Sequence, residues 1–306
     1  MKFIKPNFWK KNSLITYLFY PLTIITRLII FLKKTKKQIE PDIPTICVGN
    51  IYLGGTGKTQ LVIELNKILK KNYKISVIKK YYKDQVDEQK LLYKNTNLVL
   101  STNRLKTIES FKHNNNHIVI LDDGLQDKKI KYKISVVCFN SLTGVGNGKL
   151  LPAGPLRESL SELKNYNAVF INGDKKRYLI NLIKNSNNKI KIFNGKYFLK
   201  NKKDFSNKKR YFAFCGIGTP ENFFKLLKEY NIKLKDKLIF PDHYDYKLSD
   251  VNRIKKLAKD INCQLITTEK DYMKIKKFKN FKTKFAKIDL KIYDQAKFIN
   301  FLKKNL

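Results

Sequence analysis

The sequence is poor in the side chains on which several large functional classes depend. It has only three histidines, four cysteines and six arginines in 306 residues. The cysteines are widely spaced and form no C-x-x-C pair, so we expect buried thiols rather than a disulfide framework or a zinc cluster. With so little arginine and no clustered aromatic motif, we expect no nucleic-acid partner. Any catalytic imidazole must come from His113, His117 or His243.

Acidic residues are also scarce. There are 25 of them against 64 Lys and Arg, which gives a formal net charge of +39. One interpretation is a compositional bias that puts lysine on every solvated face. The other is attraction to a polyanion, such as an anionic bilayer or a phosphorylated substrate. The chain is 42% hydrophobic, which is enough for a real core, and its length suggests two compact domains or one large domain with additions.

The N-terminus carries no recognisable cleavable signal peptide, because no A-x-A-like site follows its apolar run. Residues 13–32 are mostly apolar and about as long as one bilayer crossing. Pro21 interrupts the run, and Arg27 would cost about 2.5–3.5 kcal/mol near the bilayer centre. The polar residues share one helical stripe: Thr16, Thr23, Thr26 and Arg27. Flanking lysines favour a helix lying at a membrane surface, with a single crossing and a helix packed on the soluble domain as alternatives.

From residue 44 onward the chain alternates between short apolar strands and helices. The strands are rich in β-branched residues and lack alternation, which is typical of parallel strands covered by helices on both faces. The sequence therefore predicts an α/β fold with a mainly parallel sheet and a second, smaller α/β domain. We expect strands at 45–48, 75–78, 98–100, 118–121, 134–139 and 168–171, with a helix at 59–69. In the second domain we expect strands at 211–215 and 264–267, and helices at 221–230 and from a Ser249 cap to 260.

A glycine-rich segment follows the first predicted strand: Gly54, Gly55, Thr56, Gly57, Lys58 and Thr59. In this strand–loop–helix setting it has the form of a P-loop that binds a nucleoside triphosphate. Glycines let backbone N–H groups curl around phosphate oxygens, and the helix N-terminus adds partial positive charge. We expect Lys58 to meet the β- and γ-phosphates of ATP and the Thr59 hydroxyl to ligate Mg²⁺. Tyr52 stands where the strict pattern has its first glycine.

Two carboxylates, Asp122 and Asp123, come directly after the predicted strand 118–121. A buried strand that delivers carboxylates to the edge of the sheet beside a P-loop is the Walker B arrangement, in which a carboxylate holds Mg²⁺ directly or through water. Alone, this pattern is usually a turn. Together with the upstream P-loop it predicts a metal site.

Two further features contain acidic residues that could act in catalysis. Asp87 and Glu88 follow the second predicted strand, and Asp242 precedes His243. A kinase that phosphorylates an alcohol benefits from a carboxylate that accepts the hydroxyl proton. Spacing alone nevertheless favours a solvated acidic pair in the first case and a surface turn in the second.

Several segments taken together resemble one family, the tetraacyldisaccharide 4′-kinases, also called lipid A 4′-kinases. The run L-L-P-A-G-P-L-R-E at 150–158 is especially specific, because it has no generic role in a P-loop protein. The matching segments run in order along the chain and include 48–50, 54–59, 121–126, 146–148, 150–158, 216–223, 240–243 and 267–271.

The resemblance implies an ATP- and Mg²⁺-dependent kinase that phosphorylates the 4′-hydroxyl of tetraacyldisaccharide 1-phosphate to give lipid IVA. It implies a peripheral or monotopic enzyme at the cytoplasmic face of the inner membrane, whose partners are the lipid A disaccharide precursor and the membrane lipid surface. We expect a monomer. The predicted parts are an N-terminal membrane-associated helix (1–38), a nucleotide-binding core (39–200) and a C-terminal domain (201–306). A two-stranded linker near 196–199 and 286–290 would join the domains, with the last helix packing back on the core.

Residue by residue, the resemblance assigns catalytic roles to Asp87, His243 and Lys58. Asp87 would be the base and would pair with His243, which reverses the interpretation from spacing. The implied metal site comprises Thr59, Asp122, Asp123 and Glu88. Candidate substrate contacts are Asn50, Gln126, Arg104 and Arg157, the two arginines because a guanidinium fork suits a phosphate.

Some positions depart from the family pattern. The usual S-R-G-Y-G-R after the second strand reads I-K-K-Y-Y-K at 78–83, and Asp127 stands where a histidine is usual. These changes leave the phosphate, metal and base positions intact and bear on contacts with the substrate phosphate. Two alternatives therefore accompany the kinase hypothesis: a membrane-bound nucleotide switch that acts on no lipid, and an inactive member of the family.

Overall fold

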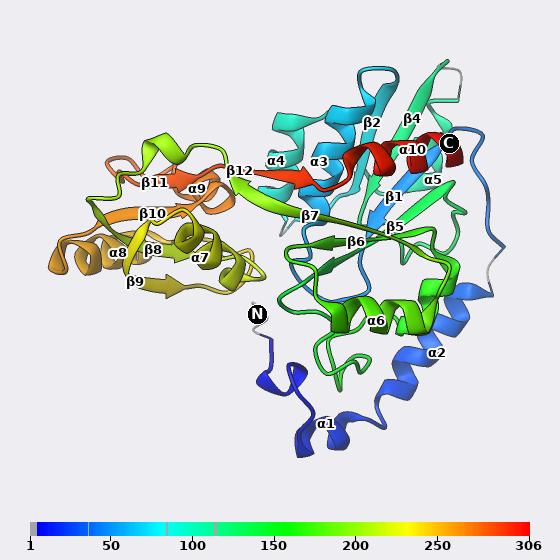
Figure 1. Cartoon of the computed structure of the whole chain (residues 1–306), viewed down its shortest axis with the longest axis horizontal. Coiled ribbons are helices and arrows are strands. Elements are labelled where there is room, and N and C mark those ends of the chain that lie inside the picture. Colours follow the sequence, from blue (N-terminus) through cyan, green and yellow to red (C-terminus); the bar gives the residue numbers. More distant parts are fainter. Residues whose placement is uncertain (1–4, 36, 84, 113–114) are drawn as a thin grey trace. The chain divides into compact units, whose positions relative to one another are not determined.

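The computed structural model describes residues 5–35, 37–83, 85–112 and 115–306. These residues form a mostly parallel sheet of eight strands and a parallel sheet of four (Figure 1). They divide into a larger unit, 5–81, 92–196 and 292–306, and a smaller unit, 82–91 and 197–291. The predicted α/β class, with a second and smaller sheet, is confirmed. The domain boundaries expected from the sequence remain a prediction.

The eight-stranded sheet has the order β12-β7-β6-β5-β1-β4-β2-β3. Its strands are β1 (Thr45–Gly49), β2 (Lys74–Lys80), β3 (Leu98–Ser101), β4 (His117–Asp122), β5 (Ile134–Asn140), β6 (Ala168–Asn172), β7 (Lys191–Leu199) and β12 (Ile288–Ile292). Strands β1 to β7 pair in parallel, so their carboxyl ends share one edge. In the register of β1 and β4, Val48 lies opposite Asp122. The P-loop and the acidic pair therefore begin side by side at that edge.

The helices of the larger unit include α3 (Lys58–Leu69), α5 (Arg104–Glu109), α6 (Arg177–Ser186) and α10 (Gln295–Asn305). Helix α3 buries leucines four residues apart, at 61, 65 and 69, as an amphipathic helix on a sheet must. Helix α10, the last element of the chain, packs against the sheet through Phe298. The ring of Phe298 lies 4.5 Å from that of Phe193 and 6.1 Å from that of Phe170.

The apolar N-terminal run forms two helices, α1 (Leu14–Phe19) and α2 (Thr23–Lys34). The break falls at Pro21, whose ring and missing N–H do not suit a helix interior. No helix among the described residues is long and apolar enough to cross a membrane.

The three threonines of the predicted polar stripe face the larger unit, whereas Arg27 is exposed. Thr16 and Thr23 are buried, and the Thr26 hydroxyl donates a hydrogen bond of 2.7 Å to the carbonyl of Leu151. The apolar side chains instead face solvent, with exposed fractions such as 89% for Leu14. Further exposed residues are Ile15, Tyr17, Leu18, Ile24, Ile25, Leu28, Phe31 and Leu32. This amphipathicity is the reverse of that in a helix packed on a soluble core.

The smaller unit contains the four-stranded sheet in the order β11-β10-β8-β9. Its strands are β8 (Arg210–Cys215), β9 (Lys233–Ile239), β10 (Gln264–Thr268) and β11 (Lys284–Ala286). Its helices are α7 (Pro220–Glu229), α8 (Leu248–Asp260) and α9 (Glu269–Ile275). Strand β9 was not predicted from the sequence, because its K-L-K-D-K-L-I pattern carries too many charges for a buried strand. In the structure its residues are mostly exposed.

Two details of the smaller unit bear on the site. The prediction that Ser249 caps α8 is wrong, because the helix already begins at Leu248 and the cap is Lys247, whose N–H donates to Asp250 at 2.8 Å. Helix α4 (Val86–Asn95) begins in the smaller unit and ends in the larger one. Asp87 and Glu88, in its first turn, therefore belong to the smaller unit.

Candidate active site

The glycine-rich loop joins β1 to α3, as the sequence predicts. Gly54 and Gly57 have φ angles of +134° and +93°, which residues with a Cβ atom rarely adopt. Lys58 and Thr59 are the first two residues of α3. The N–H groups of the loop and of the first helical turn are therefore available to phosphate oxygens, at the end of the helix whose dipole favours anions.

Asn50 supports this loop from a fully buried position. Its side-chain amide donates to the carbonyl of Gly54 and to the hydroxyl of Thr56, both at 3.1 Å. Gln126 in turn donates to the backbone carbonyl of Asn50 at 3.0 Å. In this structure, two of the residues expected to contact the substrate hold the backbone of the P-loop in shape.

The family-specific run at 150–158 packs along the start of the loop. The N–H of Leu53 donates to Pro155 at 2.8 Å, and that of Arg157 donates to Ile51 at 2.7 Å. Between them Tyr52 forms a β-bridge with the run and is only 5% exposed. The position that departs from the strict P-loop pattern is thus filled by a buried aromatic side chain that the run covers.

Asp122 ends β4 in a completely buried position, and one of its oxygens is paired. Lys79 lies opposite it on the neighbouring β2, and the lysine Nζ atom is 2.8 Å from Asp122 Oδ2. Both side chains are nearly inaccessible to solvent, at 2% and 0%. The second oxygen, Oδ1, is buried without a hydrogen-bond partner among the described residues. An unsatisfied buried carboxylate oxygen calls for a ligand.

Asp123 follows in a left-handed conformation with φ of +58°, which turns its side chain toward two cations. Its carboxylate lies 3.2 Å from Arg157 Nη1 and 3.7 Å from Lys58 Nζ. Burial alone would raise the pKa of Asp123, but the charges of Lys58 and Arg157 hold it below its usual value. Arg104 donates to the backbone carbonyl of Asp123 at 2.9 Å and lies 3.5 Å from Asp127, the residue found in place of the family's histidine. Both arginines expected at the substrate therefore converge on Asp123.

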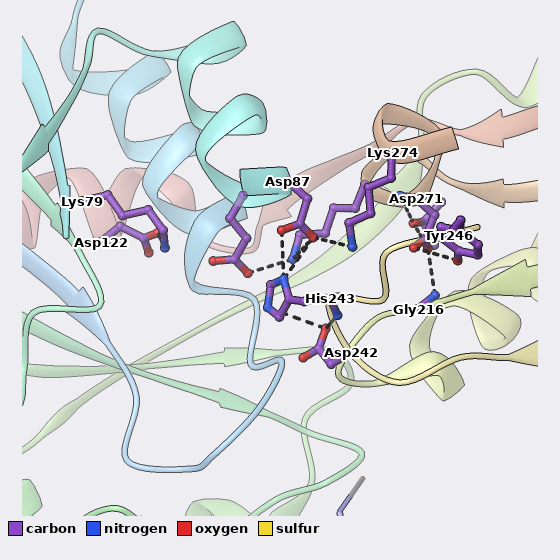
Figure 2. Close-up of polar contacts among 12 residues, drawn as sticks. Lys79, Asp87, Asp122, Gly216, Asp242, His243, Tyr246, Asp271 and Lys274 are labelled. Carbon is purple, nitrogen blue, oxygen red and sulfur yellow. Dashed lines mark hydrogen bonds and ion pairs between the residues drawn. The ribbon is translucent and has the colours of Figure 1, made fainter. Parts of the chain in front are cut away.

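A second cluster lies wholly within the smaller unit and contains Asp87 and His243 (Figure 2). His243 lies in the turn after β9 with φ of +55°, and its N–H donates to the side chain of Asp242 at 3.0 Å. The imidazole Nδ1 atom is 2.9 Å from Asp87 Oδ1 and 3.1 Å from Oδ2. The structure thus brings together the acid and imidazole that the resemblance pairs, 156 residues apart in the sequence.

The environment of this pair shifts both pKa values toward the charged forms. Burial alone would raise the pKa of Asp87, but the hydrogen bond from His243 and the charges of Lys270 and Lys274 hold it well below its usual range. Burial would lower the pKa of His243, yet the hydrogen bond to Asp87 raises it above its ordinary value. Asp87 is therefore anionic at neutral pH, and His243 gains a proton more readily than a solvated histidine does.

Sequence analysis missed the two lysines of α9 that complete this cluster. Lys274 Nζ lies 3.1 Å from Asp87 Oδ2, and Lys270 Nζ lies 4.0 Å from the same oxygen. Lys270 also donates to Glu88 at 2.8 Å. Lys270 belongs to the T-T-E-K-D motif at 267–271, which was noted only for its resemblance. In a chain with 64 basic residues, no composition signal singled out Lys274.

The residues of the larger unit fit a magnesium ion. Mg²⁺ prefers oxygen ligands, and usually takes one or two carboxylates together with water and substrate phosphates. The unpartnered Asp122 Oδ1, at the carboxyl end of β4, and the Thr59 hydroxyl, in the first turn of α3, supply that chemistry. Among the described residues no group of three or more acidic, histidine or cysteine side chains gathers as a self-contained metal site. Glu88, expected as a metal ligand, pairs with Lys270.

Of the two histidines that the structure describes, one lies where catalysis could use it. His117 begins β4, at the opposite end of that strand from Asp122, and contacts Ser76 at 3.1 Å. His113 falls outside the described residues. Of the two described histidines, His243 is the one that faces a carboxylate in a candidate site.

Comparisons with known proteins agree with these motifs. The family model described as "Tetraacyldisaccharide-1-P 4'-kinase" (LpxK) matches residues 14–306. A tetraacyldisaccharide 4′-kinase of Pelagibacter ubique is 42% identical over 305 residues, covering 98% of this chain and 97% of the relative. The enzyme of the same name from Rickettsia felis is 33% identical, covering 92% and 91%.

A crystal structure of LpxK from Aquifex aeolicus in complex with ATP matches with a TM-score of 0.69 and 22% sequence identity. The match covers 95% of this chain and 99% of that one, and it shows a common fold. The full-length family match and the identity to the curated enzymes go further. On that basis, the chain belongs to the tetraacyldisaccharide 4′-kinase (LpxK) family.

Proposed function

We propose that this kinase of lipid A biosynthesis transfers the γ-phosphate of ATP to the 4′-hydroxyl of tetraacyldisaccharide 1-phosphate, giving lipid IVA, and that Asp87 accepts the hydroxyl proton. The observation that carries the assignment of the base is the contact of 2.9 Å between Asp87 and His243. A buried carboxylate held by an imidazole is a pairing suited to proton transfer and has no evident structural purpose at a turn.

The donor side of the reaction is assigned to the larger unit. The P-loop, Lys58 and the start of α3 would bind the phosphates of ATP, and Lys58 would neutralise charge that develops on the γ-phosphoryl group. Asn50 and Gln126 keep the loop in its binding shape through the hydrogen bonds described above. Asp123 holds Lys58 and Arg157 beside the loop, so both cations are positioned before a ligand arrives.

A magnesium ion is part of the proposal. Thr59 and Asp122 would hold it, and Asp123 would support it through a water molecule. When bound, it would neutralise the β- and γ-phosphate oxygens. Lys79 faces Asp122 from the protein side and is the countercharge of this buried carboxylate.

The acceptor side depends on proton transfer. The 4′-hydroxyl is a weak nucleophile, and its oxygen attacks the γ-phosphorus as its proton passes to Asp87. The product ADP leaves with the electrons of the broken P–O bond. His243 orients Asp87 and can take the proton from it, because the imidazole Nδ1 atom faces both carboxylate oxygens.

The N-terminal helices are assigned to the membrane surface. The threonines of their polar stripe pack on the protein, and their apolar residues are exposed. Lysines flank the apolar segment on both sides, at 10, 11, 33, 34 and 37, and suit an anionic lipid face. We propose a monomeric, peripheral or monotopic enzyme at the cytoplasmic face of the inner membrane, where its lipid substrate lies.

The test is a transfer assay with purified protein, ATP, Mg²⁺ and tetraacyldisaccharide 1-phosphate, read by mass spectrometry as the gain of one phosphate. Asp87→Asn should lower kcat by about 10²–10⁴-fold while leaving ATP binding intact. Gain of phosphate at undiminished rate in that variant would remove Asp87 from the mechanism. Hydrolysis of ATP without any phosphorylated lipid would favour the nucleotide-switch alternative.

A further inference from the structure

Two lysines of α9 face Asp87 but have no part in nucleotide binding or in the proton transfer itself. Lys270 and Lys274 are four residues apart, so they project from one face of the helix. The Nζ atom of Lys274 is buried and has no hydrogen-bond partner among the described residues. Its compensation is the ion pair of 3.1 Å with Asp87. A buried ammonium group is costly unless a countercharge faces it, so Lys274 is fitted to the ionised form of Asp87.

The contacts divide the two oxygens of Asp87 unequally. Oδ2 faces both lysines, at 3.1 and 4.0 Å, and also lies 3.1 Å from His243. Among the described residues, the hydrogen-bond partner of Oδ1 is His243, at 2.9 Å. A carboxylate oxygen has two lone pairs in the carboxylate plane, so Oδ1 keeps one that no described residue occupies.

Helix α9 is itself anchored by the fully buried Asp271, whose contacts with Gly216 and Tyr246 are drawn in Figure 2. The carboxylate of Asp271 accepts hydrogen bonds from the N–H of Gly216 at 3.0 Å, from Tyr246 at 3.0 Å and from Thr268 at 2.7 Å. These bonds tie α9 to the loop after β8 and to the segment that follows His243. The lysines therefore approach Asp87 from a rigid support.

We propose that Lys270 and Lys274 are positioning residues for the base: they fix the Asp87 carboxylate through Oδ2, supply its countercharge, and leave Oδ1 as the atom that accepts the hydroxyl proton. This inference rests on the proposed role of Asp87 in phosphate transfer. The acceptor oxygen forms a bond to the γ-phosphorus, the bond from that phosphorus to ADP breaks, and the proton moves to Asp87 Oδ1. Lys270 also holds Glu88, so the lysine pair orients the whole first turn of α4.

The lysines have a second effect, on the proton held by His243. Around the Asp87–His243 pair lie two lysines and two further carboxylates, those of Glu88 and Asp242, the last at 3.8 Å from His243 Nε2. The buried Asp271 also has an electrostatic interaction with Lys274. The charge of Lys270 opposes protonation of His243 and so limits the rise of its pKa. Removing a lysine leaves the cluster more negative, which should raise the pKa of the Asp87–His243 pair as a unit.

The experiment compares Lys274→Met with Lys276→Met, which removes an exposed lysine from the end of the same helix. Lys274→Arg restores the charge, and Lys270→Met tests the second lysine. The full-length proteins are titrated by NMR at histidine Cε1, with His243→Gln identifying one of the three signals. The same proteins are assayed for kcat/KM against pH with ATP and tetraacyldisaccharide 1-phosphate.

We expect the His243 titration and the acid limb of the rate profile to move up by about one pH unit in Lys274→Met, which lowers the rate about 10-fold below that limb. Lys270→Met should shift them in the same direction. Lys276→Met should overlay the parent, and Lys274→Arg should return toward it. If Lys274→Met leaves the His243 titration unmoved, the positioning role is wrong, whether or not the rate falls. If Asp87→Asn transfers phosphate at the parental rate, the proposed base fails first and separately.

Discussion

Replacing Leu14 and Leu18 with serine should release the protein from anionic vesicles without slowing phosphate transfer to a detergent-dispersed substrate. These side chains lie four residues apart on α1 and are 89% and 76% exposed, the largest apolar exposures of that helix. The double change leaves the net charge unaltered. Any loss of binding therefore reports apolar contact and not attraction between lysine and lipid headgroups.

The size of the effect follows from transfer energies. Full burial of one leucine is worth about 1.5–3 kcal/mol, so two contribute about 3–6 kcal/mol. The boundary between headgroups and acyl chains buries a surface helix only in part. Taking about half of that sum gives 1.5–3 kcal/mol, roughly a 10- to 150-fold weaker partition into vesicles.

Sedimentation with vesicles that contain anionic lipid measures this partition. The matched control is Leu100→Ser with Leu248→Ser, two leucines that are 43% and 60% exposed on β3 and α8. If the α1 pair binds vesicles as well as the control pair does, the exposed face of the N-terminal helices is not the membrane contact. Loss of transfer in detergent as well would instead indicate that α1 supports the fold.

Three further predictions concern the two clusters. The pKa of His243 is raised above 6.5, so its pairing with Asp87 adds stability below about pH 6.5, and this stability is lost as the pH rises through the folded pKa. His243→Gln should therefore lower Tm more at pH 6 than at pH 9. Equal losses of Tm at the two pH values would contradict this. Asp271→Ala leaves three hydrogen-bond donors without an acceptor and should lower the free energy of unfolding in urea by about 3–5 kcal/mol. Asp271→Asn keeps an acceptor oxygen and should lower it by less. Similar losses in the two variants would refute the hydrogen-bond explanation. Arg157→Lys keeps the positive charge beside Asp123 but loses the guanidinium fork, so kcat/KM should fall about 10-fold or more while Tm stays unchanged. An unchanged kcat/KM would mean that Arg157 does not act at the phosphate site.

Much of the larger sheet was predictable because its strands are buried on both faces. Six of them read as mostly apolar runs, and the structure places each within two residues of its expected ends. The P-loop was equally clear, since φ angles such as +93° at Gly57 demand glycine and leave a signature in the sequence. Strand β9 had neither signal. It is mostly exposed, and its stability comes from pairing with β8, which no local pattern reveals.

The candidate site was only half visible for a related reason. Asp87 and His243 were identified by resemblance, and spacing alone argued against them, because their contact joins residues 156 positions apart. Lys274 had no motif to mark it. The interpretation of a lysine depends on what faces it, and only the fold brings Lys274 within 3.1 Å of a buried carboxylate. The opposite case is that of Asn50 and Gln126. They were predicted from the resemblance as substrate contacts, but in the structure they bond and support the P-loop.

The run at 150–158 gains a physical explanation from its position in the larger unit. At one end it is hydrogen-bonded to the N-terminal segment: Trp9 donates to the carbonyl of Pro152 at 2.9 Å, and Thr26 donates to the carbonyl of Leu151 at 2.7 Å. At the other end it is bonded to the start of the P-loop through Pro155 and brings Arg157 to Asp123.

A P-loop enzyme with a soluble acceptor has no need of such a connection. If the N-terminal helices lie at the membrane surface as proposed, a short run bonded both to them and to the P-loop would hold the nucleotide site at a fixed distance from the lipid. That double attachment gives these nine residues a physical role beyond phosphate binding. The chemistry of phosphate binding alone does not require it.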